Sequence, residues 1–225
     1  GGFAVIKAKK SSLVNFTSFR GLSAPKKGRW ELTGAVTFYS SPVDITNSSF
    51  INNKSEDGLN IIRSKFTIRS SNFNRTQSDA LDVDFSFGEI TNSKFVNSGN
   101  DAMDFSGSNI ELRFINIDGV QDKGISSGEE SYVKAQNVTI KNATFGFVSK
   151  DLSTLIVKDS SLEKIQIGFS SYIKKNEYGP ASIEAHNIIF REVDKIHWIE
   201  DKSYFILNGK IIDGEEVGLS NKIYK

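Results

Sequence analysis

The chain has no cysteine and almost no net charge. Among its 225 residues there are 0 Cys and 3 Pro, and 28 basic against 27 acidic side chains leave a net charge of +1. The absence of cysteine excludes a disulfide framework and a thiolate metal site. A net charge near zero offers no global field for nucleic acid, so we expect no nucleic-acid partner and only a local electrostatic function.

Long apolar runs are missing as well. No run approaches the roughly 18 residues that a membrane helix needs. The start of the chain, Gly1-Gly2-Phe3, carries neither the basic region nor the apolar stretch of a signal peptide. We therefore expect no membrane span, and we expect a mature protein or a domain cut from a longer chain.

A regular repeat dominates the sequence. Eight times a branched or small residue is followed five positions later by a bulky apolar one, from Ile45 and Phe50 to Leu207 and Ile212. The first members of these pairs are 22 or 23 residues apart, with one interval of 28. Self-similarity at a fixed period of this length is typical of a solenoid. The pattern predicts a single domain over residues 1–225.

Each unit contains a short alternating segment, such as Leu81-Asp82-Val83 or Met103-Asp104-Phe105. Alternation with period two predicts a strand whose outer residues face the core and whose middle residue faces outward. Asn, Asp or Gly recurs two positions after the Ile45 column, as at Asn47 and Asn92. These residue types favour tight bends, so strands and bends alternate along each unit.

Three short strands and three bends fit into one unit of about 22 residues, and stacked units of this kind form parallel sheets. The predicted fold is all-β, a right-handed parallel β-helix solenoid of about nine coils with 22–23 residues per coil. The hand is inferred from the right-handed crossover of parallel strands. An amphipathic helix is excluded because apolar residues do not recur at i, i+3, i+4 and i+7.

Three consecutive units share a strand motif, namely Asp57-Gly58-Leu59-Asn60-Ile61, Asp79-Ala80-Leu81-Asp82-Val83 and Asp101-Ala102-Met103-Asp104-Phe105. Together with the Asn bend column, this motif resembles the pectate-lyase-like β-helix superfamily over residues 2–212. The resemblance implies a secreted or cell-surface, bacterial type of protein whose partner is a polysaccharide. It also implies that an enzyme of this kind is a polysaccharide lyase, a glycoside hydrolase or epimerase-like. One fold hosts many functions, so the reaction stays open.

Carboxylates gather at the outward positions of neighbouring coils. Asp82 and Asp104 occupy equivalent middle positions one unit apart, which places them about 5 Å from each other on adjacent strands. Such a pair can share a cation or work as an acid and a nucleophile. The predicted catalytic residues are Asp82, Asp104, Lys123 and Lys150.

The resemblance allows two reactions at this face. In a lyase, Lys or Arg takes the proton α to a uronate carboxylate, while Ca²⁺ bound by acidic residues holds that carboxylate. In a hydrolase, two Asp residues act around the glycosidic bond. A structural role is the alternative, because an Asp before a tight bend commonly accepts hydrogen bonds from backbone amides. The predicted Ca²⁺ ligands are Asp79, Asp84 and Asp101.

Two insertions interrupt the repeat, at residues 20–34 and 172–180. Insertions in solenoids form loops that often border a binding face, and aromatic or basic loop residues suit stacking on sugars. The predicted substrate-binding residues are Trp30, Asn60, Arg63, Ser126 and Tyr172.

The ends of a solenoid expose unpaired strand edges. Residues 213–225 are predicted to cap the C-terminal end through Val217, Leu219, Ile223 and Tyr224. The first coil has no comparable cap, so we expect an upstream domain or a partner to cover it.

Together these observations predict a carbohydrate-active domain that cleaves or remodels an acidic polysaccharide on the face formed by the first strands. The alternative is a non-catalytic carbohydrate-binding or adhesion module of a larger surface or secreted protein.

Overall fold

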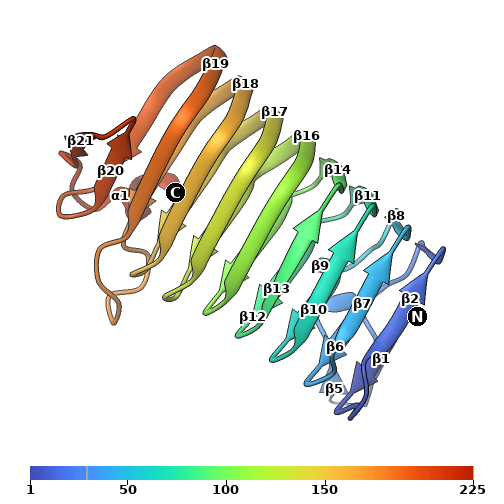
Figure 1. Ribbon diagram of the computed structural model, residues 1–225. Coiled ribbons are helices and arrows are strands. Elements are labelled where there is room, and N and C mark those ends of the chain that lie inside the picture. Colours follow the sequence, from blue (N-terminus) through green and yellow to red (C-terminus); the bar gives the residue numbers. More distant parts are fainter. Residues whose placement is uncertain (29, 225) are drawn as a thin grey trace.

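The alternating segments of the repeat form strands, and the strands of successive turns pair in parallel. A computed structural model describes residues 1–28 and 30–224 and shows a β-solenoid of about eight turns (Figure 1). The predicted all-β solenoid is confirmed, with about eight turns in place of nine. In the described part of the chain, no helix is long and apolar enough to cross a membrane.

The first half of the solenoid has three separate short strands in each turn. The face that we call the first-strand face contains β1 (Phe3–Ile6), β6 (Gly34–Tyr39), β9 (Asp57–Ile62), β12 (Asp79–Asp84) and β15 (Met103–Ser106). The second face contains β2 (Ser12–Asn15), β7 (Val43–Thr46), β10 (Lys65–Arg69) and β13 (Phe87–Thr91). The third contains β3 (Ser18–Arg20), β8 (Ser49–Ile51), β11 (Asn72–Thr76) and β14 (Lys94–Ser98).

Beyond β15 the strands continue through the bends, so that one strand runs round most of a turn. These long strands are β16 (Asn109–Gly128), β17 (Tyr132–Lys150), β18 (Thr154–Tyr172) and β19 (Ser182–Ile199). Their last residues continue the first-strand face, because Met103 pairs with Ile125 and Ile125 with Phe147. The remaining elements are β4 (Lys26–Lys27), β5 (Trp30–Glu31), β20 (Tyr204–Leu207), β21 (Lys210–Asp213) and α1 (Leu219–Ile223).

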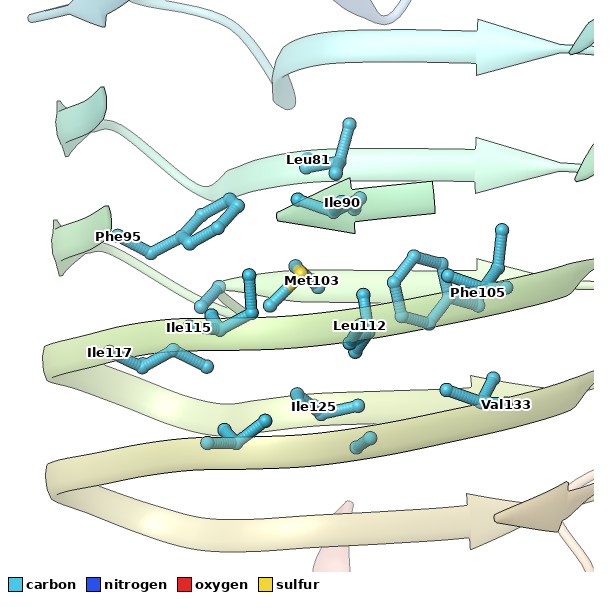
Figure 2. Packing of buried hydrophobic residues seen from close by; sticks show 14 of the residues in the cluster. Leu81, Ile90, Phe95, Met103, Phe105, Leu112, Ile115, Ile117, Ile125 and Val133 are labelled. Carbon is cyan, nitrogen blue, oxygen red and sulfur yellow. The ribbon is translucent and has the colours of Figure 1, made fainter. Parts of the chain in front are cut away.

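Inside the solenoid, like side chains stack on like. Phe50, Phe73 and Phe95 are fully buried, and the ring centroids of successive pairs lie 4.6 and 4.5 Å apart. Figure 2 shows Leu81 and Met103 on neighbouring strands in another column of the same core. Burial stabilises the fold by about 1.5–3 kcal/mol for each such side chain. The apolar columns of the repeat therefore supply the core.

Several bends hold residues in the left-handed backbone region. Asn47, Asn92 and Asn137 have φ angles of 49°, 50° and 54°. Asn tolerates this conformation better than most residues, because its short polar side chain bonds locally. The predicted Asn bend column is therefore confirmed.

A ladder of buried serines joins neighbouring coils just after the first-strand face. The backbone N–H of Ser64 donates to Oγ of Ser86 at 2.9 Å, and the backbone N–H of Ser86 donates to Oγ of Ser108 at 3.0 Å. The hydroxyl of Ser86 in turn donates to the carbonyl oxygen of Asp84 at 2.8 Å. Buried backbone groups that would otherwise lack a partner are satisfied in this way.

Candidate active site

The outward side chains of the first-strand face form columns along the solenoid axis. The strand register aligns the middle column in the order Thr37, Asn60, Asp82, Asp104 and Ser126. Neighbouring parallel strands lie about 4.8 Å apart. Asp82 and Asp104 are therefore direct neighbours, as the repeat predicts.

A second column of carboxylates lies at the start of the same strands. Asp57 is the register partner of Asp79. Oδ1 of Asp79 accepts a hydrogen bond from the backbone N–H of Asp101 at 2.8 Å, and Oδ1 of Asp101 accepts one from the backbone N–H of Lys123 at 3.0 Å. Asp79 and Asp101 thus each hold the backbone of the next coil, which is the structural role expected of an Asp before a bend.

Asp82 is a half-buried carboxyl group surrounded by other acids. Its Oδ2 accepts a hydrogen bond from Nδ2 of Asn60 at 2.8 Å. Burial raises the pKa of Asp82 well above its usual value, and the charges of Asp57 and Asp84 raise it further. The carboxyl group therefore keeps its proton to higher pH than an ordinary Asp, which suits a proton donor.

Asp104 lies in the same column but has a lysine as its partner. Nζ of Lys150 lies 3.3 and 3.4 Å from its two carboxylate oxygens. Burial by itself would raise the pKa of Asp104, but the ammonium groups of Lys150 and Lys123 outweigh burial and lower it. Asp82 and Asp104 are therefore driven toward opposite protonation states, which is the arrangement that assigns an acid and a base in a two-carboxylate site.

Lys150 reaches Asp104 across an intervening coil. Gly128 lies on that coil, and a Cβ atom built on it would come within 2.7 Å of Cε of Lys150. The missing side chain leaves the space in which the lysine stem lies. A glycine at the end of β16 thus allows an ion pair between coils that are not neighbours.

Lys123 and Lys150 are each only 3% exposed. Burial lowers the pKa of a lysine, but Asp101 beside Lys123 and Asp104 beside Lys150 outweigh burial. Both pKa values are raised as a result, so both ammonium groups stay charged. A charged ammonium cannot accept a proton, so in this state neither lysine is free to act as the base of a lyase. The two lysines position carboxylates instead.

The three predicted Ca²⁺ ligands do not form a cation site. Oδ1 of Asp79 already accepts hydrogen bonds from Nδ2 of Asn100 at 2.7 Å and from the backbone of Asp101. Oδ2 of Asp84 faces the Nδ2 donor of Asn60 at 3.4 Å. Among residues 1–28 and 30–224, no group of three or more His, Asp or Glu side chains has an arrangement that could hold a metal ion. These carboxylates therefore do not fit the predicted Ca²⁺ site.

Three of the predicted substrate-binding residues are inaccessible. Asn60, Ser126 and Tyr172 are 1%, 0% and 0% exposed. Asn60 holds the carboxyl group of Asp82, and the hydroxyl of Tyr172 lies 2.8 Å from the hydroxyl of Tyr224. These three side chains therefore have almost no exposed surface for a substrate to contact, and their role toward a substrate stays a prediction.

The other two predicted substrate-binding residues are Arg63 and Trp30. Arg63 is exposed, and its guanidinium carbon lies 5.9 Å from the centre of the Phe85 ring. Its role toward a substrate stays a prediction. The side chain of Trp30 lies outside the part of the chain that the structure describes.

The insertion at residues 172–180 brings to the site a lysine that sequence reasoning did not select. Oδ1 of Asp151 accepts the backbone N–H groups of two successive loop residues at 2.6 and 2.7 Å, and the second of these is Lys175. Lys175 forms an ion pair with Glu129. Burial raises the pKa of Asp84, the charge of Glu129 raises it further, and the charge of Lys175 lowers it. The ion pair of Lys175 and Glu129 therefore lies close enough to the site to affect the charge of Asp84. The break in the repeat was the signal that pointed to this loop.

The last part of the chain folds back over the first-strand face. We call residues 214–224 the C-terminal segment, and Figure 1 shows its helix α1 beside the later coils. Leu219 of this segment is fully buried in one cluster with Val148 and Tyr172, whereas Val217 is 76% exposed. Glu216 of this segment forms a parallel bridge with Glu200 after the last long strand, and the segment also covers part of this face, so its role as a cap stays a prediction.

Comparisons with known proteins agree with the fold. Residues 33–179 match the family model described as "Right handed beta helix region". The match confirms the predicted right-handed parallel β-helix. Comparison with curated proteins gives no match.

Solved structures with a similar fold include catalytic domains of GH87 alpha-1,3-glucanase. Two complexes with nigerose are 14% and 13% identical to the chain, with TM-scores of 0.47 and 0.48, over 92% of this chain and 55% of theirs. The catalytic unit of a GH87 alpha-1,3-glucanase from Streptomyces thermodiastaticus strain HF3-3 is 9% identical, with a TM-score of 0.33, over 78% of this chain and 53% of its own. The chain thus spans about half the length of the solved chains that it matches, and at these identities the likeness concerns the fold alone.

Proposed function

We propose that this chain, which belongs to the right-handed beta helix family, hydrolyses a polysaccharide on its first-strand face, with Asp82 as the acid and Asp104 as the nucleophile. One arrangement carries the proposal: Asp82 and Asp104 are register partners on adjacent strands, and Asn60 donates to the first while Lys150 pairs with the second. In keeping with it, burial raises the pKa of Asp82 and Lys150 lowers that of Asp104. Two adjacent carboxyl groups with opposite shifts are what glycoside hydrolysis requires.

The spacing of the two residues favours a covalent intermediate. Asp82 and Asp104 are register partners on adjacent strands, whose backbones lie about 4.8 Å apart. Such neighbours suit the short separation of about 5–5.5 Å between carboxyl groups that characterises hydrolases that retain configuration. Asp82 gives its proton to the glycosidic oxygen as the bond from that oxygen to the anomeric carbon breaks. Asp104 forms a bond to the same carbon. Water then attacks this carbon, transfers a proton to Asp82 and releases Asp104.

The charges of the first-strand face affect which kind of polysaccharide it can bind. Six carboxyl groups lie on neighbouring coils, whereas the two lysines beside them are buried and already paired. A polymer of uronates would bring further negative charge to this face, which like-charge repulsion opposes. We therefore propose a neutral polysaccharide as the substrate in place of the acidic polymer expected from the sequence. The six residues are Asp57, Asp79, Asp82, Asp84, Asp101 and Asp104.

Release of reducing ends from a panel of neutral and uronate polysaccharides tests this function. We expect turnover of a neutral polymer, and we expect Asp82→Asn and Asp104→Asn to lower it by about 10²–10⁴-fold, the usual contribution of such groups. Asp118→Asn is the matched control, because Asp118 is exposed on a different part of the coil. Asp118→Asn should leave the rate unchanged.

Two results would contradict the proposal. Hydrolysis that survives both active-site substitutions would mean that the reaction takes place elsewhere. Binding of a polysaccharide without any turnover by the unmodified protein would favour a non-catalytic carbohydrate-binding module that uses the same face.

A further inference from the structure

We infer that the site receives the end of a saccharide chain and excludes the middle of a long polymer. The inference rests on the proposed function, because it assumes that the ligand is a saccharide. It arises from how little of the first-strand face is open to solvent. Three features carry it: the length of the opening, the cover on one side of it and the shape of its rim.

The opening is short along the solenoid axis. In the middle column Asp82 and Asp104 are half-buried, whereas Asn60 before them is 1% exposed and Ser126 after them is 0% exposed. Two coils extend about 10 Å along the axis. That length suits a short saccharide, and the middle column offers an extended polymer almost no exposed side chain on either side of Asp82 and Asp104.

The C-terminal segment closes the side beyond Asp104. Oε1 of Glu200 accepts the backbone N–H of Leu219 at 3.0 Å, and Oε2 of Glu200 accepts the backbone N–H of Ile173 at 2.6 Å. One buried carboxylate thus ties the segment to the loop that follows β18. Leu219 itself is fully buried against the face, so the cover is packed and not loosely attached.

The far end of this segment reaches the coil next to Asp104. Nζ of Lys123 lies 5.4 Å and Nζ of Lys174 4.6 Å from the centre of the Tyr224 ring. Contacts between a cation and an aromatic ring at this distance are attractive. Because Lys123 also pairs with Asp101, the barrier is anchored in the same network of charges that surrounds the proposed catalytic pair.

The opening continues sideways at the rim that follows β12. Phe85 comes directly after Asp84 and is 57% exposed. A Cβ atom on Gly107 would come within 2.6 Å of the Phe85 ring, so the ring lies over this glycine. An exposed aromatic ring with Arg63 beside it suits stacking on a sugar. The remainder of the saccharide therefore leaves the site over Phe85.

The test compares long neutral polymers, namely glucan, mannan and xylan, with short oligosaccharides of the same linkage. We expect the unmodified protein to release small sugars while the viscosity of the polymer hardly falls. With Asp104→Asn, calorimetry should show binding that scales with the number of chain ends and not with the mass of sugar. A rapid fall in viscosity would overturn the inference and leave hydrolysis intact.

The binding measurement separates this inference from the proposed function. Binding that depends on chain ends, without hydrolysis by the unmodified protein, would support the inference and contradict the hydrolase. Binding that follows sugar mass would contradict end recognition whether or not the polymer is cleaved. If no saccharide of the panel binds, both end recognition and the proposed hydrolysis are contradicted.

Substitutions in the cover test the barrier directly. Leu219→Asp should detach the C-terminal segment, expose Tyr172, which packs in one cluster with Leu219, and allow cleavage within polymers. Val217→Asp is the matched control, because Val217 lies in the same segment but is 76% exposed, and it should keep the release of small sugars. Tyr224→Ala serves as a milder variant if thermal unfolding shows that Leu219→Asp no longer folds. Folded variants that still release only small sugars would show that the segment is not the barrier.

The rim is tested by Phe85→Ala. We expect KM for oligosaccharides to rise while kcat for the shortest cleavable substrate hardly changes, because stacking acts away from the bond that breaks. Phe114→Ala is the matched control, since Phe114 is 54% exposed and also has a positive φ, of 56°, but lies at a bend within β16, away from the first-strand face. An equal KM for both variants would contradict the route over Phe85.

Discussion

Nζ of Lys150 lies 3.3 Å from Oδ1 of Asp104, although 46 residues separate them in the chain. The bond passes over the coil of Gly128 and so connects coils that are not neighbours. It also lowers the pKa of Asp104 against the opposing effect of burial. A single ion pair therefore contributes both to the stability of the solenoid and to the charge of the proposed nucleophile.

Lys150→Met should destabilise the protein. The substitution leaves Asp104 without its cation, and breaking a buried ion pair costs about 3–5 kcal/mol of unfolding free energy. The pKa of Asp104 should rise as well. Urea unfolding at pH 7 measures the first effect. The exposed Lys94 provides the control, since Lys94→Met should change the free energy by no more than about 0.5 kcal/mol. Equal stabilities of the two variants would mean that Lys150 does not stabilise the fold.

Asp57→Asn should stabilise the protein near neutral pH. Burial raises the pKa of Asp57 to about 7, whereas an Asp in an unfolded chain titrates at about 3.9. The folded protein therefore binds more protons between these values, so its stability is greatest below the lower value and falls as pH rises to about 7. Asn cannot ionise, so the Asp57→Asn variant does not lose stability in this pH range. Melting temperatures at several pH values check the sign, and Asp213→Asn at an exposed site should follow the unmodified protein.

Phe73→Ala should be among the most harmful core substitutions. The Phe73 ring stacks on Phe50 and on Phe95 at centroid distances of 4.6 and 4.5 Å. Removing it leaves a cavity in the column, and such changes cost about 3–5 kcal/mol. Denaturant unfolding compares it with Phe114→Ala, a ring that is 54% exposed. If both variants unfold at the same denaturant concentration, the column of Phe rings is not a stabilising core.

Ser86→Ala tests the serine ladder. Oγ of Ser86 accepts the backbone N–H of Ser64 at 2.9 Å and donates to the carbonyl oxygen of Asp84 at 2.8 Å. The buried N–H would lose its partner, which costs about 1–3 kcal/mol. Hydrogen exchange should become faster at Ser64. Ser11→Ala removes an exposed hydroxyl and should leave both stability and exchange unchanged.

Spacing alone was enough to predict the register of the repeat. A side chain at a repeat position stacks on its equivalent one coil away, so the Phe73 and Phe95 stack and the neighbouring Asp82 and Asp104 both follow from intervals of 22 residues. The left-handed bends follow from residue type, as at Asn92. The serine ladder has the same interval and was equally visible in the sequence, but a small polar residue gives no apolar signal by which to notice it.

The accessibility of the face could not be predicted in this way. Ser126 points outward by strand periodicity and Tyr172 begins an insertion, and both are nevertheless buried. Tyr172 packs in one cluster with Leu219, which belongs to a segment outside the repeat. Periodicity contains no information on where Leu219 packs. The reach of Lys150 across Gly128 is similar, since it depends on the course of a long flexible side chain and not on the position of its Cα atom.

The number of coils in the solenoid also sets a distance along its axis. Glu200 holds the C-terminal segment on a late coil, so the number of coils between Asp104 and Glu200 sets how close the cover comes to the proposed catalytic pair. Each added coil would move the cover away by about 4.8 Å, and each deleted coil would bring it closer by the same step. A chain of this design can therefore change the length of ligand that it admits by duplicating one unit, without altering any residue of the site.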